Sequence, residues 1–162
     1  MIDQKWLFEQ QRNQFRHDEL HHQDVFCLSR NDRLKHFGLH FAKYCGRLAR
    51  NFSDEVFLKT LSDWQLVALS ASIALSDDLS MGSIDFPGLE ENEFLMRAVN
   101  ASGQFCDACE KIDHAEPFLE SAKASNREIL FLLSSIANRK AISLDDLITD
   151  RREQLRQRAF YR

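Results

Sequence analysis

Glycine and proline are scarce in this sequence, with 5 and 2 residues among 162, about 4% against an average near 12%. These two residues supply most tight turns, so a fold of many short strands is excluded. Acidic residues barely outnumber basic ones, and the net charge is −4. Such a balance gives no field that would gather nucleic acid or an anionic membrane. We therefore expect a helical protein, with neither nucleic acid nor a membrane as its partner.

Long apolar runs are also missing, and none is long enough to span a bilayer. The first residues lack the basic stretch and apolar run of a secretory signal. Only four cysteines occur, which is few for a secreted disulfide scaffold. The sequence therefore predicts a cytoplasmic protein with reduced thiols.

The content of 44% hydrophobic and 28% charged residues is typical of one folded domain with a real core. We expect an N-terminal arm or helix at 1–30 and a helical bundle domain at 31–162. The first bundle helix should begin at a cap formed by Asn31 or Asp32 and run to about Arg50. Its apolar residues recur every three or four positions, as an amphipathic helix requires: Leu34, Phe37, Phe41, Cys45 and Leu48.

Three further helices are predicted at about 55–75, 90–114 and 126–138, with a turn-rich connection at 76–89. The helices at 55–75 and 126–138 are apolar on most sides and should form the central pair. A closing helix is expected after Ser143, which has the character of an N-cap. The predicted fold is an all-α bundle of about four main helices plus terminal helices, arranged as two similar hairpins. Its 13 phenylalanines suggest that it buries more surface as a homodimer.

One face of the first bundle helix is basic. Its residues again recur every three or four positions: Arg33, His36, His40, Lys43, Arg47 and Arg50. A solvated polar face is the simpler interpretation, because every amphipathic helix needs one. The alternative is that four of these residues bind phosphate: His36, His40, Lys43 and Arg47.

Two adjacent segments resemble a known family. The segments are LHFAKYCGRL at 39–48 and LSDWQLVAL at 61–69, and ISLDDL at 142–147 with basic residues to 161 is similar to how such chains end. Together they look like the all-α nucleoside-triphosphate pyrophosphatases, the MazG-like proteins and their dUTPase relatives. The resemblance implies a helical bundle that binds Mg²⁺ through E-x-x-E and E-x-x-D motifs on facing helices. It also implies hydrolysis of nucleoside triphosphates, with a metal that stabilises charge on pyrophosphate and activates water.

The first helix pair departs from that motif. Tyr44 and Arg47 stand at the E-x-x-E positions, and Thr60 and Asp63 stand at the E-x-x-D positions. Only Asp63 keeps a carboxylate, and the charge of Arg47 would repel Mg²⁺. This pair is therefore not expected to form a normal metal site.

The second helix pair retains more acids at the matching positions, with Asp107, Glu110 and Glu128 present and Ser125 in place of the fourth. The resemblance thus implies a site for Mg²⁺ made by Asp107, Glu110 and Glu128, joined by Asp63, with Glu110 and Glu128 as catalytic residues. The alternative is that these acids lie on solvated helix faces, where such spacing is common.

Three other features have plain structural interpretations. Cys106 and Cys109 form a single C-x-x-C, which lacks half the ligands of a zinc site. The spacing of His17 and His21 would suit a metal, but no third ligand is evident. Trp64 could stack on a base, although a core position is the commoner role of such a residue.

The sequence therefore supports two hypotheses of function. The first is a divergent MazG-like nucleotide pyrophosphohydrolase, dependent on Mg²⁺ if active, whose chemistry is weakened or lost. The second is a non-catalytic helical module, a partner-binding or regulatory dimer whose basic helix face binds an anion or another protein.

Overall fold

The computed structural model describes residues 4–80 and 89–157, and every regular element within them is helical. The all-α prediction is confirmed. The helices are α1 (Gln4–His21), α2 (Gln23–Phe26), α3 (Arg30–Arg50), α4 (Asp54–Ala74), α5 (Glu91–Asp113), α6 (Leu119–Arg139) and α7 (Leu144–Arg156).

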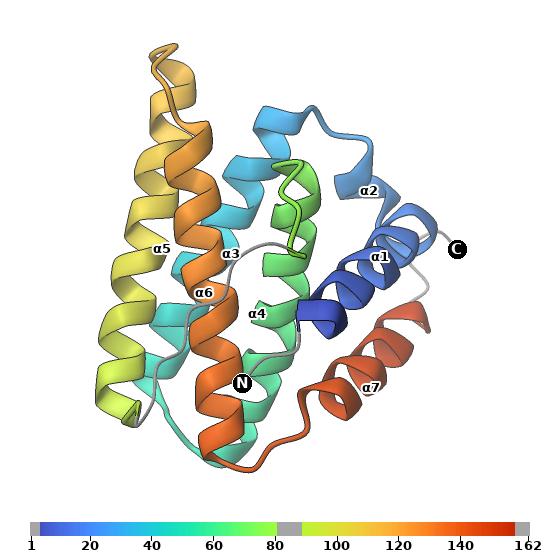
Figure 1. Ribbon diagram of the computed structural model, residues 1–162, viewed down its shortest axis with the longest axis vertical. Coiled ribbons are helices and arrows are strands. Elements are labelled where there is room, and N and C mark those ends of the chain that lie inside the picture. The colour runs from blue at the N-terminus through green and yellow to red at the C-terminus, as the bar shows by residue number, and fades with distance from the viewer. Residues whose placement is uncertain (1–3, 81–88, 158–162) are drawn as a thin grey trace.

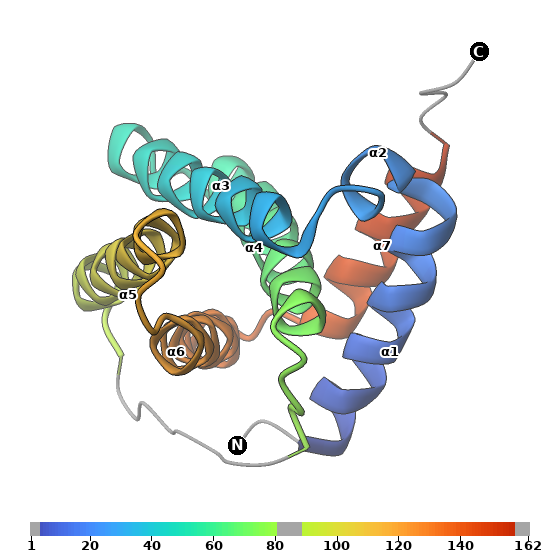
Figure 2. The same ribbon diagram turned by 90° about the horizontal axis from the view of Figure 1, so that it is seen from above.

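The helices form three layers (Figures 1 and 2). Helices α5 and α6 make one layer, and α3 and α4 make the middle one. Helices α1 and α7 lie obliquely across the other side of α4, with α2 beside them. We call α3–α6 the apolar bundle, and α1, α2 and α7 the outer layer. Because α4 contacts both, it is the shared wall of the molecule.

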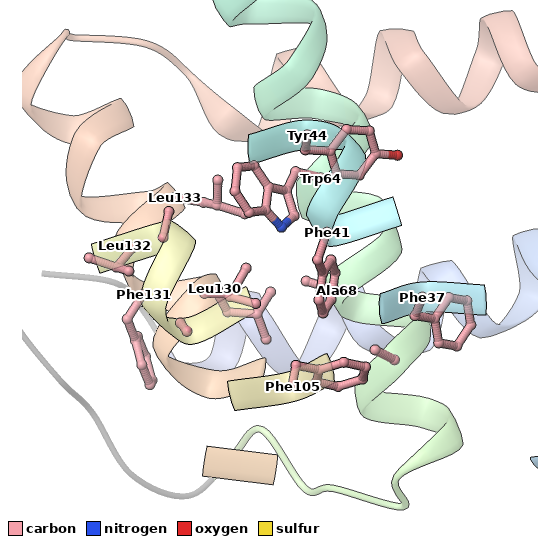
Figure 3. Packing of buried hydrophobic residues seen from close by; sticks show 14 of the residues in the cluster. Phe37, Phe41, Tyr44, Trp64, Ala68, Phe105, Leu130, Phe131, Leu132 and Leu133 are labelled. Atoms are coloured by element: carbon pink, nitrogen blue, oxygen red, sulfur yellow. The ribbon is translucent and has the colours of Figure 1, made fainter. Parts of the chain in front are cut away.

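Aromatic side chains fill the centre of the apolar bundle (Figure 3). Trp64 is fully buried, with ring centroids 5.6 Å from Tyr44 and 6.4 Å from Phe41. Phe41 in turn meets Phe105 of α5 edge to face at 4.8 Å. Burying one such side chain stabilises the fold by about 2–3 kcal/mol. The core position predicted for Trp64 is confirmed.

The two thiols of the C-x-x-C segment pack against the backbone of α3. Cys106 Sγ lies 3.6 Å from the carbonyl oxygen of Gly38, and Cys109 Sγ lies 3.3 Å from that of Leu34. Burial raises the pKa of Cys109 to about 12, so its reactive thiolate form is suppressed. These cysteines serve helix packing.

Two predicted helix boundaries were wrong. The N-cap of α3 is Ser29, whose hydroxyl accepts the backbone N–H of Asp32, rather than Asn31 or Asp32. Asp32 instead lies in the first turn, where it also accepts the Ser29 hydroxyl proton. Helix α6 begins at Leu119, seven positions before the predicted start at 126. The buried residues of its first two turns are the small Ala122 and Ser125, so this part of the helix shows little apolar periodicity.

Polar contacts hold the outer layer in place. Trp6 donates to Asp145 at 2.7 Å, joining α1 to α7. Arg152 of α7 donates to the side-chain oxygens of Gln10 and Gln14 on α1, at 2.6 and 3.0 Å. In the segment predicted as an arm or helix at 1–30, α1 therefore packs against its own chain.

Part of the predicted connection at 76–89 lies outside the described residues, as does the chain beyond 157. Before that gap, buried Asp77 is held by two hydrogen bonds from Arg127 of α6, at 2.7 and 2.8 Å. None of the described helices combines the length and apolarity that a membrane crossing needs.

Candidate functional site

A cavity of about 450 Å³ is lined by residues of α3, α4 and the outer layer. Its longest wall is the basic face of α3, which contributes Arg33, His36, Phe37, His40, Lys43, Tyr44 and Arg47. The four residues proposed from sequence as phosphate ligands, His36, His40, Lys43 and Arg47, therefore line one partly open cavity. On that face Arg33, His36, His40 and Arg47 are partly buried, whereas Lys43 and Arg50 are exposed.

The other walls come from helices that sequence reasoning did not connect to this face. Helix α4 contributes Lys59, Asp63 and Ser70 among others, and α7 contributes Arg151. Asp18 of α1 closes a third side, where it accepts hydrogen bonds from Ser70 at 2.5 Å and Gln14 at 2.8 Å. No periodic pattern could have indicated the contact between Ser70 and Asp18, because it joins single residues 52 positions apart in the chain.

One carboxylate at the basic end of the cavity is held between two guanidinium groups. Asp63 accepts from Arg151 Nε at 2.6 Å and from Arg47 Nη1 at 3.3 Å. The same Arg47 nitrogen lies 3.5 Å from the hydroxyl of Thr60, and its guanidinium carbon lies 5.4 Å from the ring centroid of Tyr44. The four positions that match the family motif of the first helix pair thus meet, with an arginine cation among them.

Cations outnumber carboxylates on the cavity wall. Five arginine or lysine residues face three aspartates. Arg47 and Arg151 both pair with Asp63. The other three cations have no carboxylate within ion-pair distance in the described chain: Arg33, Lys43 and Lys59. Burial and the neighbouring charge of Arg47 lower the pKa of Lys43, which is the response of an ammonium that lacks a counter-ion. The wall would therefore be stabilised by an added negative charge.

Two histidines stand in the middle of the basic wall. The ring centroids of His36 and His40 lie 4.6 Å apart, and the two ring planes are tilted by 52° to each other. Burial, followed by the charge of Lys43, lowers the pKa of His40 to about 4. Burial likewise lowers the pKa of His36. His40 is neutral near pH 7, so its ring is available as a hydrogen-bond acceptor.

The opposite end of the cavity is aromatic and apolar. Val25 and Phe26 of α2 face Phe37 of α3, with Ile73 of α4 behind them. The guanidinium of Arg33 lies 5.7 Å from the ring centroid of Phe26, and its Nε is buried without a hydrogen-bond partner among the described residues. A ligand with an anionic group and an apolar body would match both ends.

The carboxylates assigned to Mg²⁺ do not gather. Asp107 pairs with Lys111 at 2.6 Å and Glu110 with His114 at 3.1 Å, both on the exposed side of α5. Glu128 of α6 lies 3.8 Å from Arg97, while Asp63 is held by Arg47 and Arg151 as described above. Nowhere in 4–80 or 89–157 do three His, Cys, Asp or Glu side chains form a group that could hold a metal ion.

The donor set around Asp63 also does not fit Mg²⁺. This cation needs several oxygen ligands, and the nearest side chains to the carboxylate are two guanidinium groups. The other metal candidates are His17 and His21, whose ring centroids lie 5.0 Å apart with the ring planes tilted by 48°. His17 is largely buried beside His22. The described geometry therefore favours an anion in the cavity over a divalent cation.

Compared with known proteins, the chain matches no protein-family model, no curated protein and no solved structure. Any function must therefore be argued from the cavity itself.

Proposed function

We propose that this protein is a binding module that holds a small anionic ligand, carrying a phosphate or similar group, in the cavity between α3, α4 and the outer layer. The observation that carries the proposal is the excess of cations on the wall, where five arginine or lysine residues face three aspartates and Arg33, Lys43 and Lys59 have no carboxylate partner in the described chain. Arginine and lysine donors in a partly desolvated site bind phosphate oxygens strongly.

The size and shape of the cavity support a small molecule. Its volume of about 450 Å³ lies within the range of about 300–1,000 Å³ typical of small-ligand pockets. The anionic group would lie near Lys43, Arg47 and Arg151, and the body would lie against Phe26 and Phe37. A nucleotide is one ligand of this kind, and it is also the partner that the sequence predicts.

Asp63 has a structural role in this proposal. Two guanidinium groups on α3 and α7 would repel each other if the carboxylate between them were absent. By bonding both, Asp63 fixes their positions at the basic end. Both arginines retain further N–H groups for an incoming anion.

Titration calorimetry of the full chain with pyrophosphate in the presence of EDTA tests the proposal. We expect saturable binding with one site per chain, because the cations need no metal to attract the anion. Replacing Lys43 with methionine should weaken binding about tenfold, which is the loss of one charge-assisted hydrogen bond.

The matched control is Lys123→Met on α6, which removes the same charge at a residue paired with Glu120 outside the cavity wall. This variant should bind pyrophosphate like the wild type. Equal weakening in both variants, or no saturable binding at all, would contradict the proposal.

The nucleotide pyrophosphohydrolase implied by the family resemblance stays a prediction. Incubation with a panel of nucleoside triphosphates and Mg²⁺ or Mn²⁺ tests it. Pyrophosphate release that disappears in Glu110→Gln would support the hydrolase and would contradict a purely binding role. The homodimer also stays a prediction, for which sedimentation velocity is the direct measurement.

A further inference from the structure

The contacts of His40 reveal its protonation state. Its Nδ1 lies 3.0 Å from Lys43 Nζ and 3.0 Å from Tyr44 Oη. An ammonium group has only donors, so Nδ1 must accept from Lys43 and cannot carry a proton itself. The proton of the neutral ring is then on Nε2.

This arrangement makes Lys43 and a protonated His40 incompatible. A proton on Nδ1 would place two donors and two positive charges 3.0 Å apart. Tyr44 could remain as a partner, because a phenol oxygen also accepts. The ammonium of Lys43 would have to leave His40, and it lies on the wall of the same cavity.

Resting on the proposed function, we propose that a divalent anion enters the basic end of the cavity together with one proton, which binds His40 Nδ1 and frees Lys43 to contact the anion. The proton comes from solvent and no covalent bond changes. The pair His40–Lys43 is thus the element that couples anion binding to pH.

The surrounding charges favour this coupling. The ionisable groups that share the cavity with His40 come from four sides: Arg33, His36, Lys43, Tyr44 and Arg47 on α3, Lys59 and Asp63 on α4, Arg151 on α7, and Asp18, His22 and Asp24 on the α1–α2 side. Asp63 is the carboxylate that favours the charged ring most, yet it is already bonded to two arginines. A protonated His40 therefore depends on a new negative charge, which the anion supplies.

The direction of the pH effect follows from linkage. Without anion the pKa of His40 is about 4, and a nearby dianion raises it. A group whose pKa is higher in the bound state takes up a proton on binding, so affinity rises as pH falls. As pH falls, the affinity for the anion begins to rise at the pKa that His40 has in the bound state, and it stops rising near pH 4, the pKa of His40 without anion. Within that window, affinity should change by up to about tenfold per pH unit.

Sulfate is the appropriate probe, because it is a dianion that does not itself titrate near neutral pH. Calorimetry at about pH 6 in two buffers of different ionisation enthalpy measures the protons taken up per sulfate bound. We expect net proton uptake in the wild type, because His40 is almost entirely unprotonated at this pH without sulfate. His40→Asn keeps a polar group beside Lys43 but cannot titrate, so it should bind sulfate with little uptake.

His114→Asn is the matched control, since His114 is exposed at the far end of α5, and it should keep the uptake of the wild type. Sulfate binding without proton uptake in the wild type would overturn the coupling while leaving the binding module intact. Absence of sulfate binding would overturn both. Loss of uptake in His36→Asn but not in His40→Asn would overturn the assignment to His40.

A second measurement does not depend on the folding of the His40 variant. The ring signals of His40 can be followed by NMR through a pH titration of the wild type. We expect the midpoint to rise when sulfate is added. In Lys43→Met without sulfate it should also rise above the wild-type value, because a neighbouring cation is removed. A midpoint unchanged by sulfate would contradict the proposal.

Discussion

The apolar bundle and the outer layer are held together by different forces. Helix α4 and helix α6 each bury more than ten residues, most of them apolar. Helix α7 buries only Ile148, and α1 buries Leu7 together with Gln10, Gln14 and His17. Hydrophobic burial therefore sets the stability of the bundle, whereas hydrogen bonds and ion pairs set the position of the outer layer.

The difference explains where the cavity lies. Two apolar surfaces would close on each other and exclude such a space. Here the partly polar face of α3 meets a layer that is fixed by single contacts, such as Arg151 to Asp63 and Ser70 to Asp18. Because these contacts hold the walls at defined points, a polar gap remains between them. The binding site is the place where the two kinds of packing meet.

The largest effect should come from the bundle core. Phe105→Ala removes a fully buried ring that packs against Phe41. We expect a loss of about 3–5 kcal/mol in the free energy of unfolding, measured by urea denaturation. The control Leu39→Ala, at a side chain that is 72% exposed, should change stability by less than about 0.5 kcal/mol. Similar losses in both would show that the core is not where the bundle is stabilised.

A smaller and more local effect is expected in the outer layer. Arg152→Met removes the guanidinium that donates to the side-chain oxygens of Gln10 and Gln14. Because these oxygens then lack a hydrogen-bond donor, we expect the free energy of unfolding to fall by about 2 kcal/mol. Amide hydrogen exchange should show lost protection in α1 and α7 while α5 and α6 stay protected. Arg156→Met, at an exposed ion pair with Glu153, is the control and should leave the exchange pattern unchanged. Loss of protection throughout the bundle would contradict the separation of the two regions.

Acid should weaken the outer layer before the bundle. Burial, followed by the charge of His22, lowers the pKa of His17 from 6.5 to about 4. Since the unfolded chain binds that proton more readily, the contribution of His17 to stability is complete above pH 6.5 and is lost as pH falls towards 4. We expect a loss of about 2 kcal/mol across this window.

Stability curves at several pH values check this expectation. His17→Gln should lose less stability than the wild type between pH 6.5 and 4, whatever its stability at neutral pH. A variant with the same slope as the wild type would show that His17 does not carry the effect. As pH is lowered, amide protection against hydrogen exchange should be lost in α1 at a higher pH than in α6.

The sequence was sufficient for the bundle and for one wall of the site. Regular apolar spacing predicted α3, α4 and α5 to within a few residues, because those helices bury a continuous stripe. The same periodicity showed that His36, His40, Lys43 and Arg47 share a face. Cavity residues such as Asp18 and Arg151 were missed because polar contacts across long sequence separations leave no periodic trace.

The carboxylates predicted to bind Mg²⁺ show what helical spacing alone cannot predict. Asp107 and Glu110 are neighbours on α5, as their spacing requires, but α5 turns them to the exposed side. Spacing along a helix fixes which residues share a face, and only packing decides what that face meets. The role of Asp63 likewise depended on Arg151, which lies 88 positions away in the chain.

The most direct test is pyrophosphate binding to Asp63→Asn in the presence of EDTA. An asparagine keeps one side-chain oxygen that can accept from an arginine, but it removes the negative charge that repels the anion. We therefore expect several-fold tighter binding than in the wild type, with lower stability because Arg47 and Arg151 lose their shared carboxylate. A site built on a divalent cation would behave in the opposite way. Binding that requires Mg²⁺ and disappears in Asp63→Asn would contradict the account.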